Sequence, residues 1–129
     1  MSSPHALSGQ CILVLEDEPL ITLDVVDALR RTGASIVSAR SSHDALHQMN
    51  KHKVTAAVLD VHLGTNDDCG DVCEELTRQG VPFLFYTAYG NVRVLEEWDN
   101  IPVVSKPAYP SEITATLTRL VVSQCHLVG

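Results

Sequence analysis

Ala56-Ala57-Val58-Leu59-Asp60-Val61 is the stretch that decides the fold of this chain. Apolar residues run without a break into one carboxylate, and neither face of the run is polar, which predicts a strand buried on both sides. In an open parallel sheet, ligands bind at the carboxyl ends of the strands. Asp60 therefore stands where a doubly wound α/β protein carries out its chemistry.

Length, composition and charge restrict the class of protein. The chain has 129 residues, of which 45% are hydrophobic and 19% are charged, and this predicts one globular domain. We expect a flexible N-terminus over residues 1–9, the domain over 10–124 and a C-terminal tail over 125–129. The net charge of −7, without basic clusters, argues against a nucleic-acid partner. Because the sequence shows neither a membrane-length apolar run nor a signal peptide, we expect a cytoplasmic protein without a membrane partner.

Apolar runs alternate with amphipathic segments along the rest of the chain. The predicted strands cover residues 11–15, 35–39, 55–60, 81–86 and 101–104. The predicted helices cover residues 19–32, 42–52, 69–80, 91–98 and 109–123. Such alternation predicts a parallel sheet with helices on both faces, joined by right-handed crossovers.

Charged and polar side chains follow four of the predicted strands. Glu16 and Asp17 follow the first strand, Asp60 ends the third, Thr87 follows the fourth and Lys106 follows the fifth. Because the carboxyl ends of parallel strands gather at one edge of the sheet, we expect these side chains to lie together.

Three carboxylates brought together repel one another, so the group requires a cation. Mg²⁺ prefers oxygen ligands and keeps several of its waters. We expect Asp17 and Asp60 to hold it directly, and Glu16 directly or through water. Lys106 would offset the remaining negative charge.

Such a site suits phosphoryl transfer to an aspartate, because a carboxylate can act as a nucleophile and form an aspartyl phosphate. Thr87 and the backbone N–H of Ala88 would donate hydrogen bonds to a phosphoryl oxygen. Each residue alone also has a structural interpretation. Acids after a strand can cap the next helix, Thr87 can cap a turn, and Lys106 can form a surface ion pair.

The cysteines allow two interpretations. Cys69 and Cys73 are four residues apart on a predicted helix, with His62 upstream, so a metal site is conceivable. The alternative is that both are small apolar core residues in a reducing compartment.

Four segments together resemble the receiver domain of bacterial two-component response regulators. They are Ile12-Leu13-Val14-Leu15-Glu16-Asp17-Glu18-Pro19, Val58-Leu59-Asp60-Val61-His62-Leu63-Gly64, Tyr86-Thr87-Ala88 and Ser105-Lys106-Pro107. The resemblance covers residues 9–123 and implies a flavodoxin-like (βα)5 fold, doubly wound, with strand order 2-1-3-4-5.

The resemblance implies a role for each matching residue. Asp60 would accept a phosphoryl group from the histidine of a histidine kinase or phosphotransfer protein. Asp17, Asp60 and the backbone carbonyl of His62 would bind Mg²⁺, with Glu16 as the second acid of the pocket.

The other two segments supply the groups that face the phosphoryl group. The resemblance implies that Thr87 contacts the phosphoryl group and moves on activation. It implies that Lys106 pairs with Asp60 and then with the phosphate. The Lys106–Pro107 peptide bond is expected to be cis, which an X-Pro bond tolerates.

The sequence departs from the family pattern at the expected switch position. Val103 stands three residues before Lys106, where the family usually has Tyr or Phe, and Tyr89 is a candidate to take its place. The run from Pro82 to Gly90 is similar to a subgroup of short receivers with a Phe-Ala-Thr-Gly-Tyr-like motif, associated with a variant class of histidine kinases in alphaproteobacteria. We also expect His62 and Tyr89 to tune dephosphorylation, because they flank the path of an attacking water.

The leading hypothesis is a phosphorylation-dependent signalling receiver that is not an enzyme beyond its own phosphorylation and dephosphorylation. It is either a single-domain regulator or a receiver cut from a longer regulator or hybrid kinase, and it would switch a downstream protein partner through the 91–123 face. One alternative is a Mg²⁺-dependent phosphatase with an aspartate nucleophile, although such enzymes usually carry an acid where this chain has His62. Another is a pseudo-receiver that binds partners without being phosphorylated.

Overall fold

The computed structural model describes residues 4–88 and 92–128, in which strands and helices alternate strictly. The strands are β1 (Cys11–Leu15), β2 (Ser35–Ala39), β3 (Ala56–Leu59), β4 (Phe83–Thr87) and β5 (Val103–Ser105). The helices are α1 (Pro19–Arg30), α2 (Ser42–Lys51), α3 (Gly70–Arg78), α4 (Val92–Glu97) and α5 (Pro110–Val128). The predicted alternation is confirmed.

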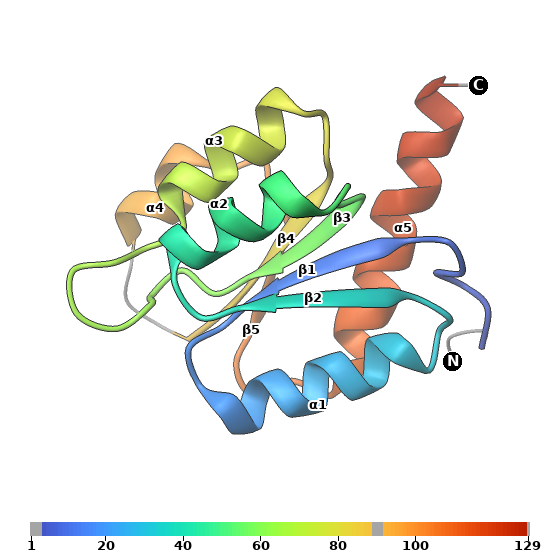
Figure 1. Ribbon diagram of the computed structural model, residues 1–129, viewed down its shortest axis with the longest axis horizontal. Helices are drawn as coiled ribbons and strands as arrows, with labels where there is room; N and C mark the ends of the chain where they lie inside the picture. Colours follow the sequence, from blue (N-terminus) through green and yellow to red (C-terminus); the bar gives the residue numbers. More distant parts are fainter. Residues whose placement is uncertain (1–3, 89–91, 129) are drawn as a thin grey trace.

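The five strands form one parallel sheet in the order β2-β1-β3-β4-β5, as expected (Figure 1). The register places Leu15 opposite both Ala39 and Leu59, so the first three strands end at the same level. The chain reverses its direction of winding between β1 and β3. In doubly wound folds the residues that follow the strands at this point face a crevice.

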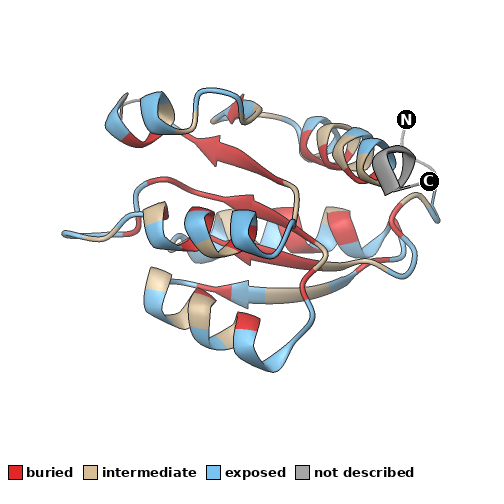
Figure 2. Cartoon of the chain, turned by 90° about the horizontal axis from the view of Figure 1, so that it is seen from above, coloured by how far each residue is buried: buried red, intermediate tan, exposed pale blue. Residues whose placement is uncertain are grey.

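Helices cover both faces of the sheet: α1 and α5 lie on one face, and α2, α3 and α4 on the other (Figure 1). Side chains therefore alternate along β3 between two cores, with Val58 packed on the α1 and α5 side and Leu59 on the other. Figure 2 shows the central strands buried along their length, with exposure concentrated on the outer faces of the helices. This double coverage explains why the strand at 56–59 is apolar throughout.

Two strand boundaries differ from the predictions because of prolines. Residues 81–86 were expected to form a strand, but β4 begins at Phe83, directly after Pro82. In the same way β5 begins at Val103, after Pro102, instead of at residue 101. Proline has no N–H to donate to a sheet, so each strand begins at the residue after its proline, two residues later than predicted.

Ordered contacts occur in both segments that were expected to flank the domain. The expected flexible stretch 1–9 contains Leu7, which is fully buried in the α1 and α5 core and donates its backbone N–H to the Thr32 carbonyl at 3.0 Å. The segment that was expected to be flexible thus contains one apolar side chain that packs in the core, and the predicted boundary at residue 9 stays a prediction. The expected tail 125–129 is likewise helical as far as Val128.

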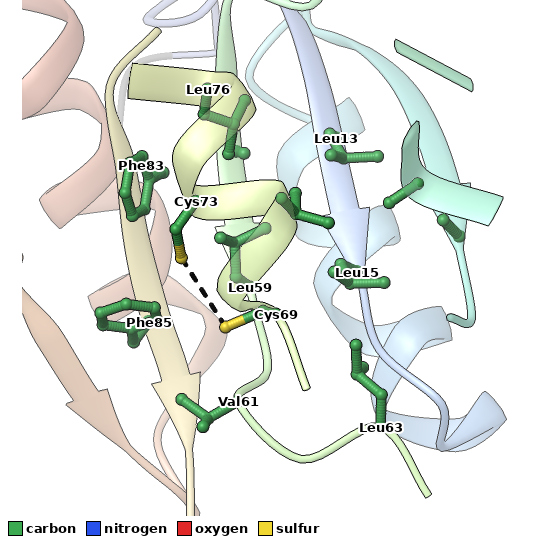
Figure 3. Close-up of a cluster of buried hydrophobic side chains, with 14 of the residues drawn as sticks. Leu13, Leu15, Leu59, Val61, Leu63, Cys69, Cys73, Leu76, Phe83 and Phe85 are labelled. Carbon is green, nitrogen blue, oxygen red and sulfur yellow. Dashed lines mark hydrogen bonds between the residues drawn. The ribbon is translucent and has the colours of Figure 1, made fainter. Parts of the chain in front are cut away.

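Cys69 and Cys73 are core residues (Figure 3). Both are fully buried, their sulfur atoms lie 3.8 Å apart, and they pack in the cluster with Phe83 and Phe85. His62 is exposed, and within the described residues the candidate metal-binding group consists of acids alone. The core interpretation of these cysteines is therefore supported.

None of the helices in the described segments is long and apolar enough to cross a bilayer.

Candidate functional site

Residues at or directly after the ends of four strands meet in one crevice at the carboxyl edge of the sheet. A cavity of about 340 Å³ opens there. Its lining consists of Asp17, Glu18, Asp60, His62, Gly64, Thr87, Ala88 and Lys106. The structure thus brings together the acids, the threonine and the lysine that the sequence placed at the strand ends.

Lys106 is the central contact of the site. Its ammonium lies 2.5 Å from Glu16 Oε1, 3.1 Å from Asp60 Oδ2 and 3.9 Å from Glu18 Oε1. The lysine side chain is only 10% exposed, and those of Glu16 and Asp60 are buried. This is a desolvated ion-pair network and not the surface ion pair that was the alternative interpretation.

The second oxygen of Asp60 is also occupied. The hydroxyl of Thr87 donates a hydrogen bond of 3.0 Å to Asp60 Oδ1, in a buried environment. The backbone fixes both partners, because the Asp60 N–H donates to the Leu15 carbonyl and the Lys106 N–H donates to the Thr87 carbonyl, each at 2.9 Å. The Lys106–Pro107 peptide bond is cis, as expected.

The buried charges shift the protonation of the site. Burial raises the pKa of Glu16 to about 7, against the lowering effect of the hydrogen bond from Lys106 and with a further increase from nearby Asp60. Burial of the ammonium acts to lower the pKa of Lys106, but the hydrogen bonds and charges of Glu16 and Asp60 outweigh it and raise that pKa. Lys106 therefore stays charged, while Glu16 changes charge near neutral pH.

Three consecutive acids form an oxygen-rich cluster beside this network. Ligand atoms of Glu16, Asp17 and Glu18 lie within 4.8 Å of one another. The backbone N–H of Glu18 donates to Glu16 Oε2 at 3.2 Å. Carboxylate oxygens next to a water-accessible cavity are a donor set that suits Mg²⁺. Asp60, which was also expected to bind the metal, lines the same cavity.

Glu18 is the residue of this cluster to which the sequence analysis gave no role in metal binding. It occupies the cap position of α1 but makes no side-chain capping hydrogen bond. Its carboxylate instead lies near Lys106. The run of three acids directly after a strand was the sequence feature that could have identified it.

The remaining predicted residues are placed as follows. His62 and Ala88 line the cavity, and the side chain of His62 is exposed. Val103 is 47% exposed on the edge strand β5, and the described lining of the cavity does not include it. Tyr89, expected to replace the missing aromatic residue and to tune dephosphorylation, lies outside the described residues.

The loop after β3 is tied to the start of α2. Both carboxylate oxygens of Asp67 accept hydrogen bonds from Ser42, Oδ1 from the hydroxyl at 2.5 Å and Oδ2 from the backbone N–H at 3.0 Å. Within the loop, the N–H of Leu63 donates to the carbonyl of Asp67 at 3.1 Å. Asp67 therefore fixes the segment that carries His62 and Gly64 along the cavity.

Comparison with known families gives a match to the response regulator receiver domain over residues 12–118. Curated relatives include the phyllosphere-induced regulator PhyR of Methylorubrum extorquens, 28% identical over 84% of this chain and 42% of that protein. The alkaline phosphatase synthesis transcriptional regulatory protein PhoP of Bacillus subtilis is 31% identical over 81% of this chain and 45% of that protein. The chain thus spans less than half the length of these relatives.

Solved structures show the same architecture. The solution structure of SdrG from Sphingomonas melonis is 30% identical, with a TM-score of 0.76 over 91% of this chain and 98% of that chain. A CheY-like receiver domain protein from Methanospirillum hungatei has a TM-score of 0.80 over 89% of this chain and 95% of that chain. At 18% identity, the second likeness supports the fold alone.

Proposed function

The chain belongs to the family of response regulator receiver domains, and on that premise we propose that Asp60 accepts a phosphoryl group from the phosphohistidine of a histidine kinase or phosphotransfer protein. One observation carries this proposal. The Asp60 side chain is 7% exposed at the cavity, with Thr87 on one oxygen and Lys106 on the other. A nucleophilic carboxylate needs such donors beside it, because they offset the negative charge of the phosphoryl group that it attacks.

The transfer requires one bond to form and one to break. An Asp60 oxygen attacks phosphorus, and the phosphorus–nitrogen bond breaks with its electron pair returning to the imidazole of the donor. Lys106 offsets negative charge on the phosphoryl oxygens, and Thr87 can redirect its hydroxyl from Asp60 to one of them. Since the lysine and the threonine already lie at the carboxylate, the protein contributes mainly positioning.

Mg²⁺ fits the donor set of the site. Glu16, Asp17, Asp60 and the backbone carbonyl of His62 are the proposed ligands, and Glu18 lies close enough to join them directly or through water. When bound, the ion would neutralise charge on the transferring phosphoryl group. The ionised form of Glu16 is the form that binds a cation, so its raised pKa links metal binding to pH near neutrality.

The downstream partner is proposed to bind the 91–123 face, formed by α4, β5 and α5. Val103, Tyr109 and Val122 are exposed large apolar residues within this part of the chain. The named relatives PhoP and PhyR are regulators, but this chain spans less than half of each. We propose a protein partner for this domain, without nucleic-acid binding of its own and with the cytoplasm as its location.

The test is the mass of the intact protein after incubation with acetyl phosphate, with and without Mg²⁺. We expect one Mg²⁺-dependent phosphoryl adduct that Asp60→Asn abolishes. Asp68→Asn is the matched control, because Asp68 is an exposed acid on the neighbouring loop and should leave the adduct intact. Continuous release of phosphate over many turnovers would favour an aspartate-nucleophile phosphatase. Absence of any adduct, also with histidine phosphotransfer donors, would favour a pseudo-receiver.

His62 and Tyr89 are proposed to tune the lifetime of the phosphoryl group. The support for His62 is its exposed position on the lining of the cavity. For Tyr89 the proposal rests on its place two residues after Thr87 in the sequence. The decay of the adduct should change in His62→Ala and in Tyr89→Ala, and unchanged decay in both would contradict the proposal.

A further inference from the structure

Tyr86 is a buried aromatic residue beside the site that the proposed chemistry does not use. It precedes Thr87 in β4, so their side chains project to opposite faces of the sheet. Thr87 contacts Asp60, whereas Tyr86 belongs to the core cluster on the α1 and α5 side. Tyr86 therefore approaches the site from the side of the sheet that carries α5.

Lys106 contacts Tyr86 as well as the two acids. Its Nζ lies over the Tyr86 ring, 5.5 Å from the ring centroid. The same atom lies 2.5 Å from Glu16 and 3.1 Å from Asp60. The electron-rich face of an aromatic ring attracts an ammonium, most strongly where water is excluded. The ring and the carboxylates thus hold one charged group among them.

The hydroxyl of Tyr86 extends this arrangement to the start of α5. It accepts a hydrogen bond of 3.4 Å from the backbone N–H of Ala108, which lies two residues after Lys106 and two before α5 begins at Pro110. A single side chain thereby contacts both the lysine that faces Asp60 and the turn that leads into α5.

We propose that Tyr86 is a positioning residue, which holds the Lys106 ammonium at Asp60 through its ring and couples that ammonium to the start of α5 through its hydroxyl. This inference rests on the proposed phosphorylation of Asp60. A phosphoryl group on Asp60 adds negative charge that attracts the ammonium. The ring contact and the hydrogen bond from Ala108 change with it, so the turn before α5 responds to the state of Asp60.

The experiment compares Tyr86→Leu and Tyr86→Phe with the control Phe85→Leu. Phe85 is a buried ring of the same strand that packs against Phe83 on the opposite face, so its loss controls for reduced packing. The readouts are the initial rate of Asp60 phosphorylation by acetyl phosphate at saturating Mg²⁺, and the amide chemical shift of Ala108 with and without beryllofluoride. Thermal unfolding of each variant confirms that it is folded at the temperature used.

We expect Tyr86→Leu to phosphorylate about fivefold more slowly than Phe85→Leu. Tyr86→Phe should restore most of the rate but lose the response of the Ala108 amide. Equal rates in Tyr86→Leu and Phe85→Leu, or an Ala108 response that survives in Tyr86→Phe, would overturn the inference.

A separate measurement distinguishes failure of this inference from failure of the proposed function. The methylene protons next to Nζ of Lys106 should show an upfield ring-current shift in the wild type that Tyr86→Leu removes. This shift does not depend on phosphorylation. If it is present but the wild type forms no adduct, the proposed function fails and the positioning of Lys106 stands. If it is absent, the inference itself fails.

Discussion

The ammonium of Lys106 lies closer to Glu16 than to Asp60, at 2.5 Å against 3.1 Å. The lysine is thus shared between an acid after β1 and the proposed acceptor after β3, and neither carboxylate has it alone. Buried acids in such a network stay compatible with folding only while the cation is present or while one of them binds a proton. Both the stability and the chemistry of the domain should therefore respond to changes at Glu16 and Lys106.

Glu16 should make the stability of the metal-free protein fall as pH rises toward neutrality. Burial raises the pKa of Glu16 in the folded state to about 7, from an ordinary value of 4.5. At a pH below the ordinary pKa, Glu16 carries a proton in both the folded and the unfolded state. Its stabilising contribution to the free energy of unfolding is then fully present. At a pH between the two pKa values, Glu16 loses its proton in the unfolded state but keeps it in the folded state. The free energy of unfolding therefore falls as pH rises, by at most about 1.4 kcal/mol per pH unit.

The measurement is urea unfolding across this pH range in the presence of a chelator, for the wild type and Glu16→Gln. The glutamine is similar in shape and does not titrate, so the difference between the two proteins isolates Glu16 from the other acids. Parallel pH profiles for the two proteins would show that the pKa of Glu16 is not raised.

Lys106→Met should destabilise the domain at neutral pH by about 3 kcal/mol, because it leaves two buried carboxylates without their cation. The loss should shrink toward about pH 5, where a carboxylate with a raised pKa can bind a proton instead. Lys53→Met is the control, since Lys53 is exposed and its removal should change stability by less than about 0.5 kcal/mol. Equal losses at both pH values would contradict the role of Lys106 as counter-charge.

Asp67→Ala should release the loop that follows Asp60 from α2. Two hydrogen bonds from Ser42 are lost, so we expect a destabilisation of about 1 to 2 kcal/mol. Because the same loop carries the His62 carbonyl, the Mg²⁺ concentration that gives half the maximal phosphorylation rate should rise about tenfold. Asp68→Ala serves as the comparison, because Asp68 caps Gly70 with one hydrogen bond of 2.8 Å. If the phosphorylation rates of Asp67→Ala and Asp68→Ala depend on Mg²⁺ in the same way, Asp67 contributes to stability only and not to metal binding.

Leu7→Ala should cost about 2 to 4 kcal/mol of unfolding free energy, since it leaves a cavity in the α1 and α5 core. Leu20→Ala is the control, because Leu20 is 79% exposed and its truncation should have little effect. Thermal or urea unfolding followed by circular dichroism measures both. Similar small effects in both variants would indicate that residue 7 is dispensable and that the domain begins at β1.

Much of the fold could be predicted from the sequence because its elements are encoded locally. The apolar run at 56–59 and its counterparts identify strands, and their alternation with amphipathic segments implies a parallel sheet covered on both faces. The predicted strand starts at 81 and 101 lie two residues before the observed starts at Phe83 and Val103. There the proline before each strand outweighed hydrophobicity, since it cannot donate to the sheet.

The sequence by itself determined which groups gather at the site. Glu16, Asp60, Thr87 and Lys106 lie at or directly after the carboxyl ends of strands, and these ends meet at one edge of the sheet. Only the tertiary structure decided how they pair. Lys106 and Glu16 are 90 positions apart, and the choice of Glu16 over Asp60 as the nearer partner depends on side-chain conformations and burial. The ring of Tyr86 and the packing of Leu7 depend in the same way on contacts that no local periodicity encodes. Hydrophobic periodicity predicts which face of a helix or strand is buried. Which residues contact that face depends on how the whole chain packs.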